Sequence, residues 1–160
     1  MRRFVLFYLL TLLSLFGLLY LDTNFIANVF NQKQTALTLS MIEPFLKTGQ
    51  LRGEDIVISP YYKIIITQAC NGMIPILFYF TAIISYPSRL CFKPLWMAVG
   101  YILFTLANVL RILIVVYFVE QKGGRENFFW AHDIFGNVIL MTLGFALFIL
   151  YIKSAAKRVA

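Results

Sequence analysis

Residues 94–119 read PLWMAVGYILFTLANVLRILIVVYFV, a stretch of 26 residues with one formal charge, at Arg111. A run of about 20 apolar residues is long enough to cross the hydrocarbon core of a bilayer as a helix. An arginine near the centre of such a helix costs roughly 2.5–3.5 kcal/mol to insert, so it normally faces a protein interior or a wet cavity and meets a partner there. The stretch therefore predicts a membrane protein, and Arg111 is its first candidate functional residue.

The composition of the whole chain favours the same class. Its 160 residues are 61% hydrophobic and 13% charged, whereas soluble domains are roughly 45–50% apolar and about 25% charged. The net charge is +7, but the basic residues form no run and no helix face, so nucleic acid is not an expected partner. The length predicts a single membrane domain, residues 1–160, embedded in a lipid bilayer.

Four apolar segments predict transmembrane helices, at about residues 4–21, 71–87, 95–119 and 132–152. The expected fold class is an all-α integral membrane protein with a small outer segment at about residues 22–69. In that segment, Lys33–Lys47 is compatible with an amphipathic helix on the membrane surface, interrupted at Pro44. The β-branched runs Ile56–Ile58 and Tyr61–Thr67 predict a short β-hairpin.

The charges predict the orientation of these segments. Placing both termini and the Tyr86–Lys93 loop in the cytoplasm gives that side no acidic residue and seven basic ones: Arg2, Arg3, Arg89, Lys93, Lys153, Lys157 and Arg158. All seven Asp and Glu residues then lie on the outer side. This is the positive-inside pattern, so we expect a multi-pass protein of the plasma (inner) membrane.

The two cysteines lie at opposite ends of the second predicted helix. Cys70 and Cys91 are 21 residues apart, roughly 30 Å along a helix, which is too far for a disulfide. Cys70 is expected outside, where an unpaired thiol is a liability unless it has a function. A helix N-terminus would favour its thiolate form. The alternative is that Cys70 is a small buried hydrophobe.

Two further residues are expected on the same membrane face as Cys70. Arg111 follows Asn108 by one helical turn, and His132, the only histidine, begins the fourth predicted helix. A cysteine with a histidine is the minimal apparatus for thiol acyl transfer, and a nearby cation can stabilise a thiolate or an oxyanion. One histidine and two separated cysteines are too few ligands for a structural zinc site, so no metal or cofactor is expected. The aromatic run Phe128–Trp130 is interpreted as a membrane-interface anchor.

Three short motifs occur in order along the chain: Ala69-Cys70-Asn71-Gly72, then Asn108-Val109-Leu110-Arg111-Ile112, then His132 with Gly136 four residues later. Together they resemble the signature of the exosortase/archaeosortase family, over roughly residues 49–151, and most closely its short exosortase H type. The resemblance implies a catalytic set with supporting residues, namely Cys70, Arg111 and His132 supported by Asn71, Gly72 and Asn108.

The resemblance also implies a function. Members are membrane-embedded cysteine proteases and transpeptidases that cleave the C-terminal sorting signals of exported proteins through a thioacyl intermediate. Their substrates carry a sorting motif, a transmembrane helix and a basic tail. Many relatives have more spans than the four predicted here, so this chain would be a minimal catalytic core, or would need a partner or assembly into a homo-oligomer.

Two other functions are compatible with the sequence. One is a non-enzymatic membrane assembly factor or small transporter subunit, with Arg111 in a structural polar network. The other is a membrane-bound acyltransferase that acts on lipids. The polar residues cluster in the outer half of the predicted bundle, whereas a transporter would distribute them through its whole depth.

Overall fold

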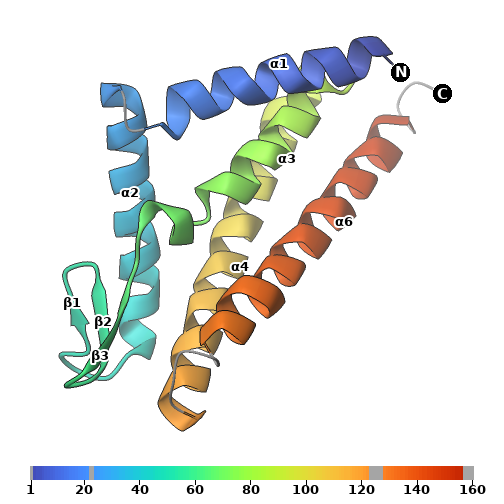
Figure 1. The fold of residues 1–160 in the computed structure, drawn as a ribbon. Helices are drawn as coiled ribbons and strands as arrows, with labels where there is room; N and C mark the ends of the chain where they lie inside the picture. Colours follow the sequence, from blue (N-terminus) through green and yellow to red (C-terminus); the bar gives the residue numbers. More distant parts are fainter. Residues whose placement is uncertain (1, 22–23, 123–127, 157–160) are drawn as a thin grey trace.

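The computed structural model describes residues 2–21, 24–122 and 128–156 (Figure 1). Its helices are α1 (Arg2–Leu19), α2 (Phe25–Ile42), α3 (Met73–Ser85), α4 (Lys93–Lys122) and α6 (Gly136–Ala156). Four short helical turns connect them, η1 (Glu43–Phe45), η2 (Gln68–Cys70), η3 (Leu90–Phe92) and the π-helical η4 (Trp130–Phe135). Three strands complete the fold, β1 (Leu51–Arg52), β2 (Asp55–Ser59) and β3 (Tyr62–Ile65). The chain is mostly helical, as predicted. Four residues of the predicted charge pattern lie outside the described residues: Lys157 and Arg158 of the cytoplasmic set, and Asp22 and Glu126 of the outer set.

Two helices among the described residues, α4 and α6, are long and apolar enough to cross a membrane. The apolar parts of α1 and α3 are shorter, at Phe4–Leu19 and Met73–Ser85. Figure 1 shows α1 lying across the top of the bundle, steeply inclined to α4. Each of the four predicted spans thus corresponds to a helix, but only two of these helices have the length of a full span.

The long helix α4 is the centre of the bundle and contacts α2, α3 and α6. Its buried face carries a polar stripe, Thr105, Asn108 and Arg111, with apolar side chains above and below it. Phe104 packs with Tyr79 and Tyr151 in one apolar cluster, which is shared with α3 and α6. The polar stripe is therefore held inside the protein, as the insertion cost of Arg111 requires.

The predicted β-hairpin is present. Strands β2 and β3 are antiparallel, with Ile56 opposite Ile64, and both of these side chains are buried. They pack against Val115 and Val119 near the end of α4. Strand β1, which was not predicted, pairs with β2 and makes the sheet three-stranded. Two residues are too short a run to show the alternation from which strands are predicted.

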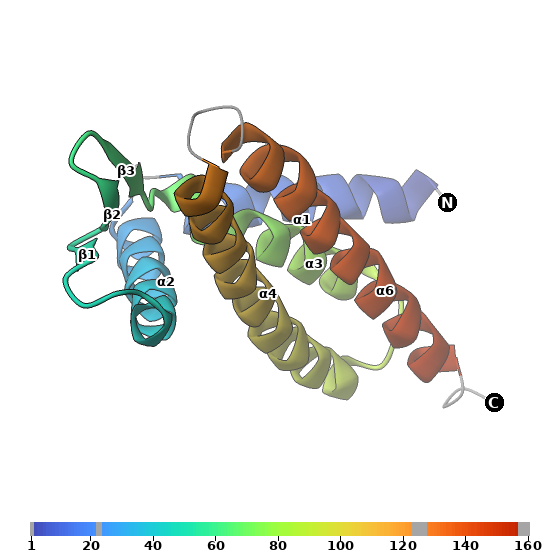
Figure 2. The same cartoon turned by 90° about the horizontal axis from the view of Figure 1, so that it is seen from below.

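The prediction for α2 is wrong in its start and its placement, whereas the predicted interruption at Pro44 is confirmed. The helix begins at Phe25, where the Asn24 side chain accepts a hydrogen bond from the Ala27 N–H at 2.7 Å. It ends at Ile42, before Pro44 in η1. Figures 1 and 2 show α2 alongside α4, not across the end of the bundle as a surface helix would lie. Its buried face is largely polar, comprising Ala27, Asn31, Gln34, Thr35, Thr38 and Ile42, so a search for an apolar face does not find it.

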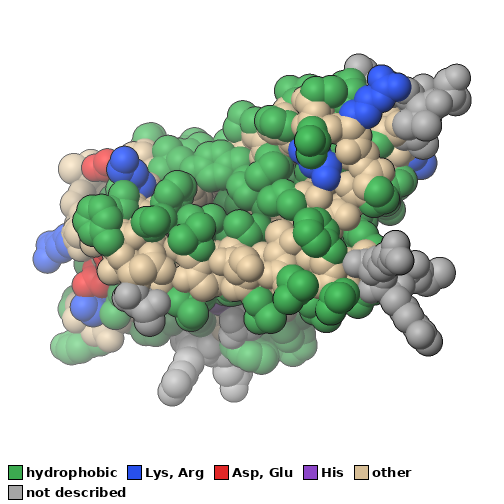
Figure 3. All heavy atoms as spheres, turned by 90° about the horizontal axis from the view of Figure 1, so that it is seen from above, with side chains coloured by type: hydrophobic (Ala, Val, Ile, Leu, Met, Phe, Trp, Pro, Cys, Tyr) green, Lys and Arg blue, Asp and Glu red, His purple; other side chains and the backbone are tan. Residues whose placement is uncertain are grey.

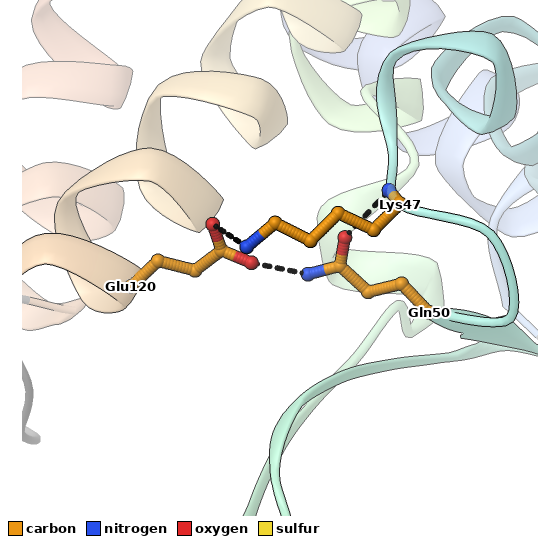
Figure 4. Close-up of polar contacts among 3 residues, drawn as sticks. All are labelled: Lys47, Gln50 and Glu120. Atoms are coloured by element: carbon orange, nitrogen blue, oxygen red, sulfur yellow. Dashed lines mark hydrogen bonds and ion pairs between the residues drawn. The ribbon is translucent and has the colours of Figure 1, made fainter.

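The described acidic side chains are confined to one end of the bundle, whereas basic side chains occur at both ends (Figure 3). The described acidic side chains, Glu43, Glu54, Asp55 and Glu120, all lie near the sheet, whereas the opposite end shows basic side chains without acidic ones (Figure 3). At the sheet end, Glu120 accepts hydrogen bonds from Lys47 at 3.0 Å and from Gln50 at 2.6 Å (Figure 4). These contacts attach the loop before β1 to the end of α4. The separation of charge is the one that the positive-inside prediction expects.

Candidate active site

Cys70 is the last residue of η2, the turn that connects the sheet to α3. The sequence analysis placed its thiol at the N-terminus of a helix, but α3 begins three positions later, at Met73. The N–H of Met73 donates to the Asn71 side chain at 2.9 Å, so one helix-terminal donor is occupied by Asn71. The thiol's side-chain contacts are instead with His132 in η4, at 3.3 Å, and with Thr67, at 3.8 Å.

The two residues after Cys70 allow the chain to turn sharply into α3. Asn71 is fully buried, and Gly72 has φ +81°, a left-handed conformation that favours glycine. A Cβ atom at Gly72 would lie 3.0–3.1 Å from the side chain of Asn108 on α4. Asn108 in turn donates from Nδ2 to the Cys70 carbonyl at 2.9 Å. The glycine thus lets α4 approach closely enough to hold the cysteine loop.

Arg111 lies one turn further along α4 and is 5% exposed. Its guanidinium donates to Asn108 Oδ1 at 3.4 Å and to the His132 carbonyl at 3.3 Å. The nitrogen that donates to this carbonyl, Arg111 Nη2, also lies 2.9 Å from His132 Nε2. A Cβ atom at Gly136 would lie 2.4 Å from Arg111 Nε, so the start of α6 leaves room for the arginine only because this residue is glycine.

His132 lies in the π-helical turn η4, immediately before α6. Its Nε2 is 3.3 Å from the Cys70 sulfur, which brings the thiol, the imidazole and the guanidinium into one cluster. The Phe128 ring stacks on the imidazole with centroids 5.0 Å apart and planes 9° from parallel. Single π-helical turns are frequent at functional sites. Here the turn lets His132 face both α4 and the cysteine loop.

The pKa of the Cys70 thiol is lowered from its ordinary value. Partial burial opposes this by disfavouring the thiolate, and it is the largest single influence. Hydrogen bonding and charge interaction with His132, together with hydrogen bonds from Thr67, outweigh it. A lowered thiol pKa increases the fraction of thiolate, which is the nucleophilic form.

The contacts also indicate which group of the cluster donates and which accepts each hydrogen bond. A guanidinium has only donors, so the 2.9 Å contact requires His132 Nε2 to present its lone pair. The same lone pair is within reach of the thiol proton of Cys70. After the imidazole takes that proton, Arg111 keeps Asn108 Oδ1 and the His132 carbonyl as acceptors. The cluster can therefore transfer one proton without breaking apart.

In a comparison with known protein families, a family model described as transmembrane exosortase matches residues 2–150. The chain belongs to the transmembrane exosortase family. No curated protein and no solved structure gives a significant match. The matched residues include all three motifs, and they also include α1 and α2, which lie before the first motif.

The structure brings together all of the candidate site residues in this exosortase-family chain: Cys70, Asn71, Gly72, Asn108, Arg111 and His132. Sequence reasoning missed the role of Phe128, which it treated as a membrane-interface anchor. The spacing of four residues to His132 could have indicated the ring contact. It also missed the polar face of α2, which contacts Asn71. The described residues contain no group of three or more His, Cys, Asp or Glu that could hold a metal ion.

Proposed function

We propose that this exosortase-family chain is a membrane-embedded cysteine protease and transpeptidase that cleaves C-terminal sorting signals of exported proteins. The observation that carries the proposal is the position of His132 Nε2, 3.3 Å from the Cys70 sulfur and 2.9 Å from the Arg111 guanidinium. A nucleophile within reach of a base, with a third group that orients the base, is the arrangement that thiol acyl transfer requires.

In the first half of the proposed reaction, His132 takes the Cys70 proton and the sulfur attacks a peptide carbonyl of the substrate. The carbonyl π-electrons move onto oxygen, and Arg111 stabilises the oxyanion as a charge-assisted donor. The oxyanion then collapses, the C–N bond breaks, and His132 gives its proton to the leaving amine. The products of this half are a thioester on Cys70 and the released C-terminal tail.

In the second half, an acceptor nucleophile attacks the thioester. His132 removes the acceptor's proton, the C–S bond breaks, and the proton returns to the Cys70 sulfur. An acceptor amine or hydroxyl completes a transpeptidase cycle, and water completes a protease cycle. The chemistry needs no metal or cofactor.

The proposed substrates are proteins whose sorting motif is followed by a transmembrane helix and a basic tail. The proposed location is the plasma (inner) membrane, with several spans, both termini in the cytoplasm and the cysteine toward the outer face. The acidic side chains near the sheet, and the basic side chains without acidic ones at the opposite end, support this orientation (Figure 3).

The test is processing of a tailed substrate by Cys70→Ser protein in membranes. Sulfur and oxygen differ little in volume but greatly in nucleophilicity, so processing should be lost while the protein still accumulates. Cys91→Ser is the matched control, because Cys91 is exposed in the turn η3 and should be dispensable. Normal processing by Cys70→Ser protein would overturn the proposal.

A structural role is the second candidate, because Arg111 is buried and donates to the Asn108 side chain on its own helix and to the His132 carbonyl in η4. In that case the chain would be an assembly factor or transporter subunit. Arg111 variants would then reduce the amount of protein in the membrane, and Cys70→Ser would have no effect on any activity.

A further inference from the structure

One face of α2 contacts the loop that carries Cys70. Gln34 is 4% exposed, and its Nε2 lies 3.2 Å from the Asn71 carbonyl and 3.5 Å from Thr105 Oγ1. Its Oε1 accepts a hydrogen bond from the Tyr101 hydroxyl at 2.7 Å. A single buried amide thus connects α2, α4 and the residue that follows Cys70.

Asn71 uses all of its polar atoms in this arrangement. Its N–H donates to the Gln68 carbonyl, and its Oδ1 accepts from Met73. Its Nδ2 lies 3.5 Å from the Asn31 carbonyl and 3.4 Å from Thr35 Oγ1, both on α2. Its carbonyl accepts from Gln34. Because Asn71 is fully buried, each of these partners replaces water that the residue cannot reach.

The orientation of the Gln34 amide follows from its neighbours. The Asn71 carbonyl can only accept, so the amide nitrogen must face it and the amide oxygen must face Tyr101. The Tyr101 hydroxyl holds that oxygen in place. The amide therefore has one orientation that satisfies both sides.

We propose that Gln34 is a positioning residue for Cys70, and that α2 and α4 hold the cysteine loop from its two sides. Asn108 holds the Cys70 carbonyl from α4, and Gln34 holds the Asn71 carbonyl from α2. These two carbonyl groups are adjacent in the chain, at the end of η2, and neither belongs to an α-helix or a strand. Side chains of α4 and α2 therefore provide their hydrogen bonds. The inference rests on the proposed function, in which the Cys70 sulfur must reach His132.

The distance to His132 explains why this position matters. The sulfur is 3.3 Å from Nε2, and a displacement of about 1 Å of reacting groups can lower a rate on the order of 100-fold. Substrate binding over the rest of the site would be unaffected. Loss of Gln34 should thus lower kcat and leave KM nearly unchanged.

The experiment compares Gln34→Met with wild type and with Thr38→Val. Methionine keeps the length and flexibility of the side chain and removes both polar contacts. Thr38 lies one turn further along α2, is fully buried, and bonds only to the Gln34 carbonyl of its own helix among the contacts described. The valine variant therefore controls for a polar change inside α2 that leaves the cysteine loop alone.

Two quantities are measured on equal amounts of membrane-inserted protein: the processing kinetics, and the alkylation rate of Cys70 in a Cys91→Ser background. We expect Gln34→Met to lower kcat on the order of 10- to 100-fold with KM within about twofold, and to change the alkylation rate. Thr38→Val should change neither. Wild-type kcat and alkylation in Gln34→Met protein, or equal losses in both variants, would overturn the inference.

A third variant keeps the test decisive if Gln34→Met protein fails to accumulate. Tyr101→Phe removes only the hydroxyl that fixes the amide, and it should lower kcat in the same way but to a smaller extent. Normal kcat in this variant would then count against the inference. Alkylation needs no substrate, so an effect of Gln34→Met on Cys70 reactivity can be seen even if the proposed cleavage reaction fails its own test.

Discussion

At the scale of single residues, His132 Nε2 is the atom on which the site depends. It lies within hydrogen-bond distance of both a thiol and a guanidinium, and one lone pair cannot fully satisfy both. In the proposed reaction, proton transfer from Cys70 resolves this competition, because protonated Nε2 can donate to the thiolate while Arg111 keeps its other acceptors. The protonation state of the imidazole therefore determines whether Arg111 donates to His132 Nε2 or is released to donate to another acceptor.

The first residue-scale prediction concerns pH. The pKa of Cys70 is lowered despite its burial, chiefly through His132, so its thiolate should persist to lower pH than an ordinary thiol's. His132→Ala removes the larger of the influences that lower this pKa, leaving the hydrogen bonds from Thr67 and the burial. The midpoint of Cys70 alkylation against pH, measured in a Cys91→Ser background, should move to higher pH. An unchanged or lower midpoint would show that His132 does not control the thiol.

The second concerns Arg111→Lys. A lysine keeps the charge but cannot present a planar set of donors to Asn108 and His132 together. We expect processing to fall on the order of 10²–10³-fold, the loss typical of one oxyanion donor. Processing per membrane-inserted protein is the measurement. Full activity with lysine would mean that a positive charge alone is sufficient.

At the scale of secondary-structure elements, the start of α6 can pack against Arg111 because its first residue, Gly136, has no side chain. Gly136→Ala would put a Cβ atom 2.4 Å from Arg111 Nε, so the arginine or the helix must move. We expect a marked loss of processing. Gly17→Ala is the matched control, because Gly17 lies in α1 with nothing within 4 Å of its Cβ position. That control should be neutral, or stabilising by about 0.5–1 kcal/mol, in thermal unfolding. Equal behaviour of the two variants would contradict this account of α6.

The elements also show which parts of the fold were predictable. The hairpin was predictable because Ile56 and Ile64 belong to β-branched runs on either side of a proline turn. The position of α2 was not predictable, because polar residues such as Gln34 and Asn31 are usually exposed to solvent. Here both are buried and contact Asn71. Polar side chains that pair with each other inside a bundle leave no periodic signal in the sequence of either helix.

At the scale of the whole molecule, the sequence predicted the residues of the candidate site better than their surroundings. Cys70, Arg111 and His132 stood out because each is chemically rare in its segment, and the structure places them together. The expectation of a thiol at a helix N-terminus was wrong, because the offset between Cys70 and the start of α3 depends on the turn at Gly72. Each of the four predicted spans is a helix, but among the described residues only α4 and α6 are long enough to cross a membrane, and composition did not show how steeply α1 inclines to α4 (Figure 1).

The whole-molecule prediction is the topology. Single cysteines are introduced at Lys47→Cys, beside the sheet, and at Arg89→Cys, at the opposite end, in a chain without native cysteines. A membrane-impermeant thiol reagent applied to intact cells should label position 47 and spare position 89, as the positive-inside pattern requires. Labelling only at position 89 would reverse the orientation and place the candidate site toward the cytoplasm.

The shortness of α3 has a consequence for the surrounding lipid. Its 13 residues extend about 20 Å, whereas a typical hydrocarbon core is about 30 Å thick. Where α3 and its neighbour α1 meet acyl chains, the bilayer must thin, or flanking polar side chains must extend to the interface, to reduce hydrophobic mismatch. In reconstituted vesicles, lipids with short acyl chains should therefore support faster turnover than lipids with long ones, at equal protein incorporation. The thickness of the membrane would then be a variable that controls the turnover rate of this chain.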